Sequence, residues 1–432
     1  MTTYLRRLGF FSGTMAVVGG IIGGGIFRTP ATVAERLRSP GAILLAWVIG
    51  GGVALIGAFC WGELGQRRPR AGGGYVYLRE TFGPLPAFLY GWTLVLVIAT
   101  GAIAAVAVTF ADYTLALIGA PHRFSVPLAI AAIVLLAGIN YVGVRPAAIT
   151  QNIFTILKLV ALAALIGAGL LLAAPSPPLA APSPPSAAFG AALVPILFTY
   201  GGWQQTNFIA EEIIEPERNL PRALVLGVTI VVVVYLLTNL AYLRVLGPEG
   251  LAFSTAPAAD TMQAVLGPVG GKVIAAGIAV STFGFLNLVI LVTPRVLQAM
   301  AADGVFFKRL AVLHPIHQTP AAAIVTLAAC AVALTLTGTF GQLVDYVTFG
   351  DWIFFGLTAA ALFRYRARET APSAVLPSAF RVPGYPLTVA VFVLAAAYVV
   401  VSAVASNPRN AAIGAGLIAL GIPAYLYWRS RL

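Results

Sequence analysis

The sequence predicts an all-α integral membrane protein, and three observations support that fold class. Of the 432 residues, 59% are apolar and only 9% are charged, whereas soluble domains contain about 25% charged residues. The apolar residues fall in runs of about 20, the length that crosses a hydrocarbon core of about 30 Å. Two of these runs are interrupted near their middles by glycine clusters. A water-soluble protein of this length could not cover its core with so little polar surface.

Twelve transmembrane helices are expected from the apolar runs and the polar or proline-rich segments between them. Their approximate spans are 9–36, 40–65, 84–118, 125–140, 150–174, 188–212, 221–246, 268–300, 320–338, 341–363, 385–405 and 411–429. We assign 9–174 to a first repeat of five helices, 188–363 to a second repeat, and 385–429 to two C-terminal helices. The uncharged, proline-rich stretch 174–185 is expected to be a passive external linker.

The lysines and arginines between the expected helices predict the orientation. They are about three times as frequent on the side of the two termini as on the opposite side, and basic loops remain in the cytoplasm. We therefore expect both termini to be cytoplasmic, with the chain spanning the cell (inner) membrane. The net charge of +12 is spread over these short connections and forms no patch. The expected surroundings are a lipid bilayer, and no nucleic acid partner is expected.

The first expected helix is broken by glycine. Residues 19–25 contain five glycines, and each costs about 1 kcal/mol relative to alanine in a helix interior. A break that faced lipid would also leave backbone N–H and C=O groups without partners, at several kcal/mol apiece. The sixth expected helix has a similar break at Gly201 and Gly202. Such breaks are expected only where they line a cavity or meet a ligand.

Paired breaks at equivalent positions of two repeats indicate a substrate site near the bilayer midplane. Close helix packing through small residues is the alternative for either glycine pair taken alone. A half-helix that begins near Gly25 would direct N–H groups and its positive dipole end toward a carboxylate. Free carbonyls beside the two breaks would suit an ammonium group. A site that offers both favours a zwitterion, and amino acids are the abundant metabolites of that kind.

Several motifs are shared with a known family of carriers. They are Gly23-Gly24-Gly25-Ile26-Phe27 and Phe198-Thr199-Tyr200-Gly201-Gly202-Trp203 at the two breaks, with Glu211 to Pro221, Glu63-Leu64-Gly65, Gly72 to Tyr77 and Thr293 to Gly304 elsewhere. Together they resemble the amino acid–polyamine–organocation superfamily, and within it the L-amino acid transporter branch. The resemblance runs from about residue 9 to about residue 385.

The resemblance implies a five-plus-five inverted-repeat (LeuT-like) fold, with helices 1 and 6 broken and two extra C-terminal helices. It implies that the amides of Gly24 and Gly25 hold the substrate carboxylate. The carbonyls of Ile21 and Phe198, with Thr199, would hold the amine, and the Phe198 ring would be a gate. The candidate substrate-binding residues are Ile21, Ile22, Gly23, Gly24, Gly25, Ile26, Phe198, Thr199, Gly201, Trp203 and Gln204.

Two residues depart from the family pattern. The usual serine of the first motif is Gly24 here, which removes a hydroxyl donor to the carboxylate. Gln204 stands where asparagine is frequent and is one methylene longer. The side-chain preference of the site therefore stays open.

Lys158 lies inside the fifth expected helix, where a charge is expensive and marks a functional candidate by default. It lies about eight residues, or about 12 Å, from the start of that span, so it could instead snorkel to the cytoplasmic interface. In sodium-independent members of the similar family, a lysine here replaces a coupling sodium ion. By that resemblance its ammonium would bond carbonyls around Gly23 and a hydroxyl of Ser281 or Thr282. We expect sodium independence, while proton symport, exchange and facilitated diffusion stay open.

The sequence therefore predicts a secondary transporter of neutral L-amino acids that works by alternating access, as an exchanger or a proton-coupled symporter. A cationic amino acid or polyamine carrier of the same fold is the alternative. It would need an acid in the pocket, and the acids Asp112 and Asp351 are expected to lie far from the two breaks. A non-transporting amino acid sensor is a more distant alternative.

Other functional classes are disfavoured. An enzyme would need His, Asp, Glu or Cys clustered at membrane depth, but the histidines lie in expected loops and no nucleotide or hydrolase motif is present. His314, His317 and Asp303 match no strong metal pattern, so neither a metal site nor a cofactor is expected. A channel would need a ring of repeated polar residues. Some members of the similar family pair with a glycoprotein through an external cysteine. No expected external loop here contains one, so no obligatory accessory subunit is expected.

Charged residues near the helix ends are weaker candidates. Arg28 is expected just outside the first break, where it could face an external vestibule. Glu63 and Arg295 are expected either to join an inner-gate network or to be solvated at the interface. The residues expected to cap and ion-pair the cytoplasmic end of the sixth helix are Glu211, Glu212, Glu215, Arg218 and Arg222.

Overall fold

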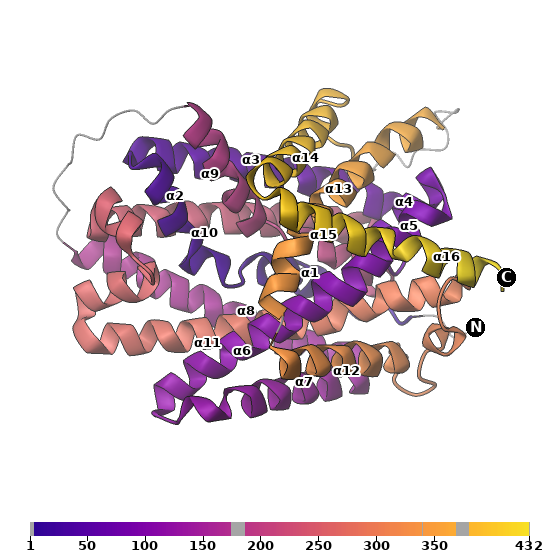
Figure 1. Ribbon diagram of the computed structural model, residues 1–432, viewed down its shortest axis with the longest axis horizontal. Coiled ribbons are helices and arrows are strands. Elements are labelled where there is room, and N and C mark those ends of the chain that lie inside the picture. The colour runs from indigo at the N-terminus through magenta and orange to yellow at the C-terminus, as the bar shows by residue number, and fades with distance from the viewer. Residues whose placement is uncertain (1–3, 174–185, 339, 369–379, 432) are drawn as a thin grey trace.

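The computed structural model describes residues 4–173, 186–338, 340–368 and 380–431, and every regular element in these ranges is a helix (Figure 1). The predicted all-α class is therefore confirmed. The predicted external linker over 174–185 lies outside the described residues.

The first part of the chain, as far as residue 173, contains α-helices and four short helical turns of other geometry. In order they are α1 Phe10–Ile21, η1 Gly25–Phe27, α2 Thr29–Leu37, α3 Pro40–Arg67, α4 Gly74–Phe82, α5 Pro84–Thr93, η2 Leu94–Ala99, α6 Thr100–Ile118, η3 His122–Phe124, α7 Ser125–Val142, α8 Val144–Gly167 and η4 Ala168–Leu172. Of these, η2 and η4 are π-helical and continue the helices that precede them.

The second part of the chain contains the remaining elements. They are α9 Ser186–Thr199, η5 Trp203–Glu212, α10 Pro216–Phe253, α11 Pro257–Ala302, η6 Lys308–Ala311, α12 Ala321–Thr337, α13 Phe340–Ala367, α14 Leu387–Ser406, α15 Pro408–Ala419 and α16 Gly421–Arg429.

Eight helical segments of the described chain are long and apolar enough to cross a membrane, and α1 and α12 are shorter apolar helices. The eight are Pro40–Arg67, Pro84–Ile118, His122–Val142, Val144–Leu172, Pro216–Phe253, Pro257–Ala302, Leu387–Ser406 and Pro408–Arg429. The chain is therefore a multi-pass membrane protein. The total of 12 spans stays a prediction.

Two helices extend beyond their predicted spans, and each does so across a bend. α10 continues past Gly247, where φ is 66°, and α11 begins before Gly267, where φ is 62°. In both helices a proline, Pro248 or Pro268, follows the glycine. Proline has the φ of a first helical turn, so the chain resumes the helix in a new direction, which apolar periodicity alone does not reveal.

α1 lies in the interior of the molecule. All of its residues from Gly13 to Ile21 are buried, and it packs against α8, α10, α11 and η5 (Figure 1). A helix that is apolar on nearly every side is buried on every side. The interruption at its end therefore lies inside the protein rather than against lipid.

The start of the chain is held against the segment that follows η5. The amides of Arg7 and Leu8 donate to the Glu212 carbonyl at 2.9 and 3.0 Å, and the Ile214 amide donates to the Leu8 carbonyl at 2.8 Å. The two ends of the chain lie at the same edge of the molecule, on the right of Figure 1.

Candidate functional site

The first helix is interrupted where the glycine cluster predicts. α1 ends at Ile21, a single 3₁₀ turn follows at Gly25–Phe27, and α2 begins at Thr29. In the part of the chain that the structure describes, the amides of Gly24 and Gly25 donate to no protein acceptor. Two N–H groups at the interruption are therefore available to a ligand.

The second interruption follows α9 and touches the first. Gly202 has a φ of 113°, a backbone conformation that glycine adopts without steric cost. A Cβ atom on Gly202 would lie 2.6 Å from the carbonyl carbon of Gly20. The hydroxyls of Thr29 and Thr199 are 2.7 Å apart and form a hydrogen bond across the two segments. The glycines thus allow close packing as well as the break itself.

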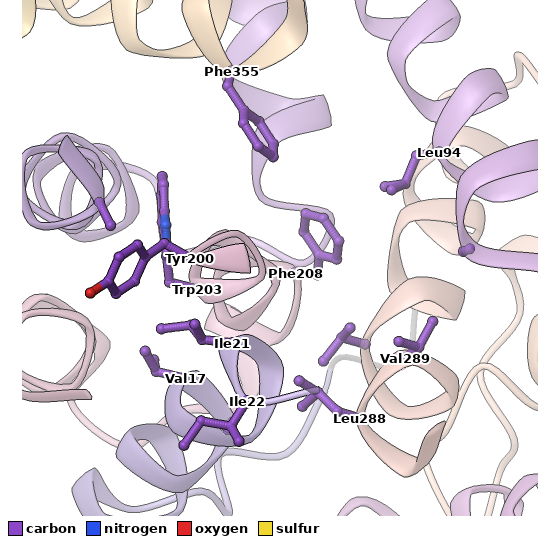
Figure 2. Packing of buried hydrophobic residues seen from close by; sticks show 14 of the residues in the cluster. Val17, Ile21, Ile22, Leu94, Tyr200, Trp203, Phe208, Leu288, Val289 and Phe355 are labelled. Carbon is purple, nitrogen blue, oxygen red and sulfur yellow. The ribbon is translucent and has the colours of Figure 1, made fainter. Parts of the chain in front are cut away.

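A cavity of about 280 Å³ lies between the two interruptions. Figure 2 shows Leu94, Phe208, Val289 and Phe355, which come from η2, η5, α11 and α13, around this region. The described residues that line it are Gly20, Ile21, Gly23, Gly24, Gly25, Leu94, Ile98, Ala99, Ala102, Ala105, Val106, Phe198, Thr199, Gly201, Gly202, Gln204, Gln205, Phe208, Phe285, Val289, Thr293, Asp351, Trp352 and Phe355.

Most of the predicted substrate residues meet at this cavity. Those that line it are Ile21, Gly23, Gly24, Gly25, Phe198, Thr199, Gly201 and Gln204. Ile22, Ile26 and Trp203 are not among the described residues that line it. Ile22 and Ile26 are fully buried, and the Trp203 ring packs edge-on against Trp61 at 4.9 Å between centroids. These side chains pack behind the residues that line the cavity.

The Ile21 carbonyl, predicted to hold an amine, is already engaged. It accepts hydrogen bonds from the Tyr235 hydroxyl at 3.1 Å and from the Gly23 amide at 2.9 Å, which occupy both of its lone pairs. The Phe198 carbonyl accepts one bond among the described residues, from Gly201 at 2.9 Å. One acceptor position for an ammonium group therefore remains on Phe198. The contribution of Tyr235 from α10 had no signal in the sequence.

Lys158 is fully buried on α8 and reaches the first interruption. Its Nζ donates to the carbonyls of Ile22 at 2.7 Å and Gly19 at 3.2 Å. The snorkelling alternative is wrong, because the side chain runs into the protein and not to the membrane surface.

The two hydroxyls predicted beside Lys158 have different environments. Ser281 of α11 donates to the carbonyls of Gly23 at 3.1 Å and Ile22 at 3.3 Å. Thr282 instead donates within its own helix, to Ile278 at 2.8 Å. The structure therefore brings Ser281 to the interruption, whereas the Thr282 hydroxyl does not reach it.

Buried ion pairs join the helices at the end of the molecule that holds both termini. Arg295 of α11 donates to Glu212 of η5 at 2.7 Å, and both side chains are at most 1% exposed. The Glu63 carboxylate, also 1% exposed, pairs with Arg67 and Arg366 at 2.6 Å each. Removing one partner of such a pair would leave an uncompensated buried charge. Glu63 and Arg295 are thus structural ion-pair members, and solvation at the interface is excluded for both.

Other predicted charges lie away from the cavity. Arg28 is exposed and does not line it. Asp112 accepts a hydrogen bond from Ser125 at 2.5 Å and lies 3.2 Å from His122.

Sequence reasoning missed the walls contributed by η2, α11 and α13. Those residues include Leu94, Phe285, Thr293, Trp352 and Phe355, and most are apolar side chains in apolar helices, so nothing in the pattern separates them from lipid-facing ones. Asp351 was expected far from the two interruptions. The structure corrects this, because Asp351 lies on the cavity wall. The carboxyl group inside an apolar span was the one sequence signal that could have indicated a place for Asp351 at the site.

Comparison with known proteins identifies the family. The model of the amino acid permease family matches residues 8–427. The chain belongs to this family. It is 32% identical over 442 aligned residues to the human Asc-type amino acid transporter 1, covering 99% of this chain and 83% of the relative. It is 34% identical to the mouse b(0,+)-type amino acid transporter 1, covering 84% and 76%. It is 31% identical to the human large neutral amino acids transporter small subunit 2, covering 99% and 81%.

This permease is therefore an amino acid transporter of the amino acid–polyamine–organocation superfamily. Its relatives are L-type transporters and not enzymes. The cavity between the two interrupted helices is its candidate substrate site.

Proposed function

We propose that the permease carries neutral L-amino acids across the plasma membrane by alternating access and without sodium, as an exchanger or a proton-coupled symporter. The observation that carries this proposal is the meeting of two interrupted helices at one cavity, beside a buried ammonium group. The proposal includes the five-plus-five inverted-repeat fold of 12 transmembrane helices, with interrupted helices 1 and 6. Paired interruptions of this kind are typical of carriers that bind substrate at the midplane.

The proposed binding mode uses the backbone of both interruptions. The amides of Gly24 and Gly25 hold the carboxylate, since they have no protein acceptor among the described residues. The remaining lone pair of the Phe198 carbonyl and the Thr199 hydroxyl hold the ammonium group. The Phe198 side chain is 49% exposed, and it gates the substrate by closing over it.

A neutral amino acid side chain fits the wall around it. The substrate side chain would contact small and apolar residues such as Ala102, Val289 and Phe355. The similarity to a relative named for large neutral amino acids supports the same substrate class.

Sodium independence is proposed from the position of Lys158. Sodium sites in carriers with broken helices use unwound backbone carbonyls. Here the carbonyls of Gly19 and Ile22 receive an ammonium group instead, and the Ser281 hydroxyl also donates to Ile22. A fixed positive charge at this position both fills the acceptors and repels a second cation.

The proposed topology has both termini in the cytoplasm of a cell whose plasma (inner) membrane holds the chain. The excess of basic residues on that side and the position of both chain ends at one edge of the molecule support it. The two cysteines, Cys60 and Cys330, lie within α3 and α12 and not in a loop. We therefore propose a carrier that needs no disulfide-linked accessory subunit.

The test is uptake of radiolabelled amino acids by proteoliposomes that contain the purified full chain. We expect saturable uptake of L-alanine, L-serine and L-leucine and little uptake of their D-enantiomers. Preloading with unlabelled amino acid accelerates uptake in an exchanger, and an inward proton gradient accelerates it in a symporter. Uptake of polyamines without amino acids, or no uptake under any gradient, would overturn the proposal.

A further inference from the structure

Asp351 places a carboxyl group on one wall of the cavity. It lies on α13 near the middle of the helix, and among the described residues that line the cavity it is the one with a charged side chain. Lys158 does not line the cavity, because its ammonium turns to the carbonyls behind the first interruption. The carboxyl group therefore faces the substrate space without a neighbouring cation on the described wall.

The carboxyl group of Asp351 also lacks a partner among the described residues. Among the residues that the structure describes, none forms a hydrogen bond or ion pair with Asp351, whereas the buried Glu212 and Glu63 each hold an arginine. Burying a polar or charged group without a partner costs free energy that a hydrogen bond removes. Acids inside membrane spans usually serve the substrate or ion pathway. The missing donor is therefore expected to arrive with the substrate.

Gln205 adds a second acceptor to the same cavity. Its side-chain oxygen Oε1 is buried and has no hydrogen-bond partner in the described part of the chain, and the residue lines the cavity. Its element, η5, packs against α13 through the rings of Trp203 and Phe355, whose centroids are 6.1 Å apart. Two independent acceptor groups thus line one space, and neither has a donor from the described protein.

Aromatic side chains surround these acceptors. Trp352 and Phe355 of α13 line the cavity with Phe208 of η5, and the Phe355 and Phe208 rings are labelled in Figure 2. Such walls exclude water, and a hydrogen bond is electrostatically stronger where water is excluded. A substrate that brings a donor here gains a bond, while an apolar substrate of the same shape leaves both acceptors unpaired.

We propose that Asp351 and Gln205 form a side-chain subsite that accepts hydrogen bonds from a donor group on the substrate. The donor is a hydroxyl or an ammonium group of the amino acid side chain. The subsite makes the permease prefer such amino acids over their apolar isosteres. This inference rests on the proposed amino acid transport and adds a specificity-determining pair to it. A hydroxyl preference keeps the proposed neutral substrate class, whereas a preference for lysine replaces it with the cationic alternative.

The test compares isosteric competitors for radiolabelled L-alanine bound to the purified full chain, which requires binding but no transport. Threonine against valine reports a hydroxyl donor, and lysine against norleucine reports an ammonium donor. In the wild type we expect at least one donor-bearing competitor to be about tenfold stronger than its partner, the effect of one typical hydrogen bond. Asp351→Leu should lower the ratio of the two competitors' affinities, donor-bearing over apolar, to about one, and Gln205→Leu should lower this ratio less.

Two further variants sharpen the result. Asp351→Asn keeps an acceptor oxygen but loses the charge, so it should preserve a threonine preference and abolish a lysine preference. Asp112→Asn changes the carboxyl group that lies away from the cavity, bonded to Ser125, and should leave both ratios unchanged. If Asp351→Leu does not fold, Asp351→Asn and Gln205→Leu carry the test.

Several outcomes overturn the inference. One is a ratio of about one for both pairs in the wild type, and another is a wild-type preference that survives both Asp351→Leu and Gln205→Leu. A wild type that binds alanine but gives a ratio of about one for both pairs contradicts only the subsite. A wild type that binds no amino acid contradicts the proposed function, and the subsite with it.

Discussion

The Nζ atom of Lys158 lies 2.7 Å from the carbonyl oxygen of Ile22. A charge on α8 therefore satisfies the backbone of α1 and its interruption at the point where the hydrogen bonds of α1 stop. A second bond, to Gly19 at 3.2 Å, fixes the ammonium group between two carbonyls. The interruption that shapes the cavity and the buried lysine are thus parts of one arrangement.

Replacing this lysine should impair transport. Lys158→Ala leaves the Gly19 carbonyl without its donor and the Ile22 carbonyl with only the bond from Ser281, and a buried group left without a partner costs about 1–3 kcal/mol. We expect the initial rate of L-alanine uptake into proteoliposomes to fall by at least about tenfold. The control is Lys272→Ala, because Lys272 is an exposed residue of α11. Uptake by Lys158→Ala equal to that of the control would contradict the role assigned to Lys158.

The contact between the two interruptions should not tolerate a methyl group. In Gly202→Ala the new Cβ would lie 2.6 Å from the Gly20 carbonyl carbon, at a residue whose φ is 113°. Alanine at a positive φ destabilises a protein by more than about 1 kcal/mol. We expect a lower unfolding temperature of the detergent-solubilised protein and loss of uptake. Gly52→Ala in α3, which meets no atom within 4 Å, should retain both properties.

The buried ion pair should matter far more than an exposed one nearby. Glu212→Gln removes one partner of a pair with Arg295 that is at most 1% exposed, and breaking a buried pair costs about 3–5 kcal/mol. The Glu215–Arg218 pair is 3.8 Å long with both side chains more than 60% exposed, and such pairs contribute about 0–1 kcal/mol. Thermal unfolding should therefore separate Glu212→Gln clearly from Glu215→Gln. Equal unfolding temperatures would contradict the structural role of Glu212.

Removing the proposed gate should weaken substrate affinity more than stability. The Phe198 ring is 49% exposed beside the cavity, and burying a phenylalanine side chain contributes about 1.5–3 kcal/mol. Phe198→Ala should therefore raise the KM for L-alanine by about tenfold or more. Phe124→Ala is the matched control, since this ring of η3 is 45% exposed and does not line the cavity. An unchanged KM in Phe198→Ala would show that the ring does not close on substrate.

The sequence is most informative about the site at residues that contradict the structural preference of their own segment. Glycine clusters at Gly23–Gly25 and Gly201–Gly202 contradict a helix, and Lys158 contradicts an apolar span, so each marks a position where local preference yields to function. The position of both interruptions followed from the glycine clusters, whereas the membrane class followed mainly from the composition and the apolar runs. The family resemblance placed Phe198 and Thr199 at the site, and both line the cavity.

The other parts of the fold and of the candidate site depend on three-dimensional contacts that no sequence pattern encodes. An apolar wall residue such as Phe355 has the same composition and periodicity as one that faces lipid. Whether the Ile21 carbonyl is free depends on Tyr235, more than 200 positions away in the chain. Helix α4, Gly74–Phe82, is a nine-residue element, too short to produce a membrane-spanning signal. It begins after Gly73, whose φ is 45°, and the predicted spans omit it.

The most direct test of the lysine arrangement is the sodium dependence of wild-type transport. The initial rate of L-alanine uptake would be measured in proteoliposomes with sodium and with sodium replaced by choline, at equal pH and membrane potential. We predict the same rate in both solutions, because the Lys158 ammonium already occupies the carbonyls of Gly19 and Ile22. Uptake that occurs only in sodium would show that a second cation binds and would contradict the proposal.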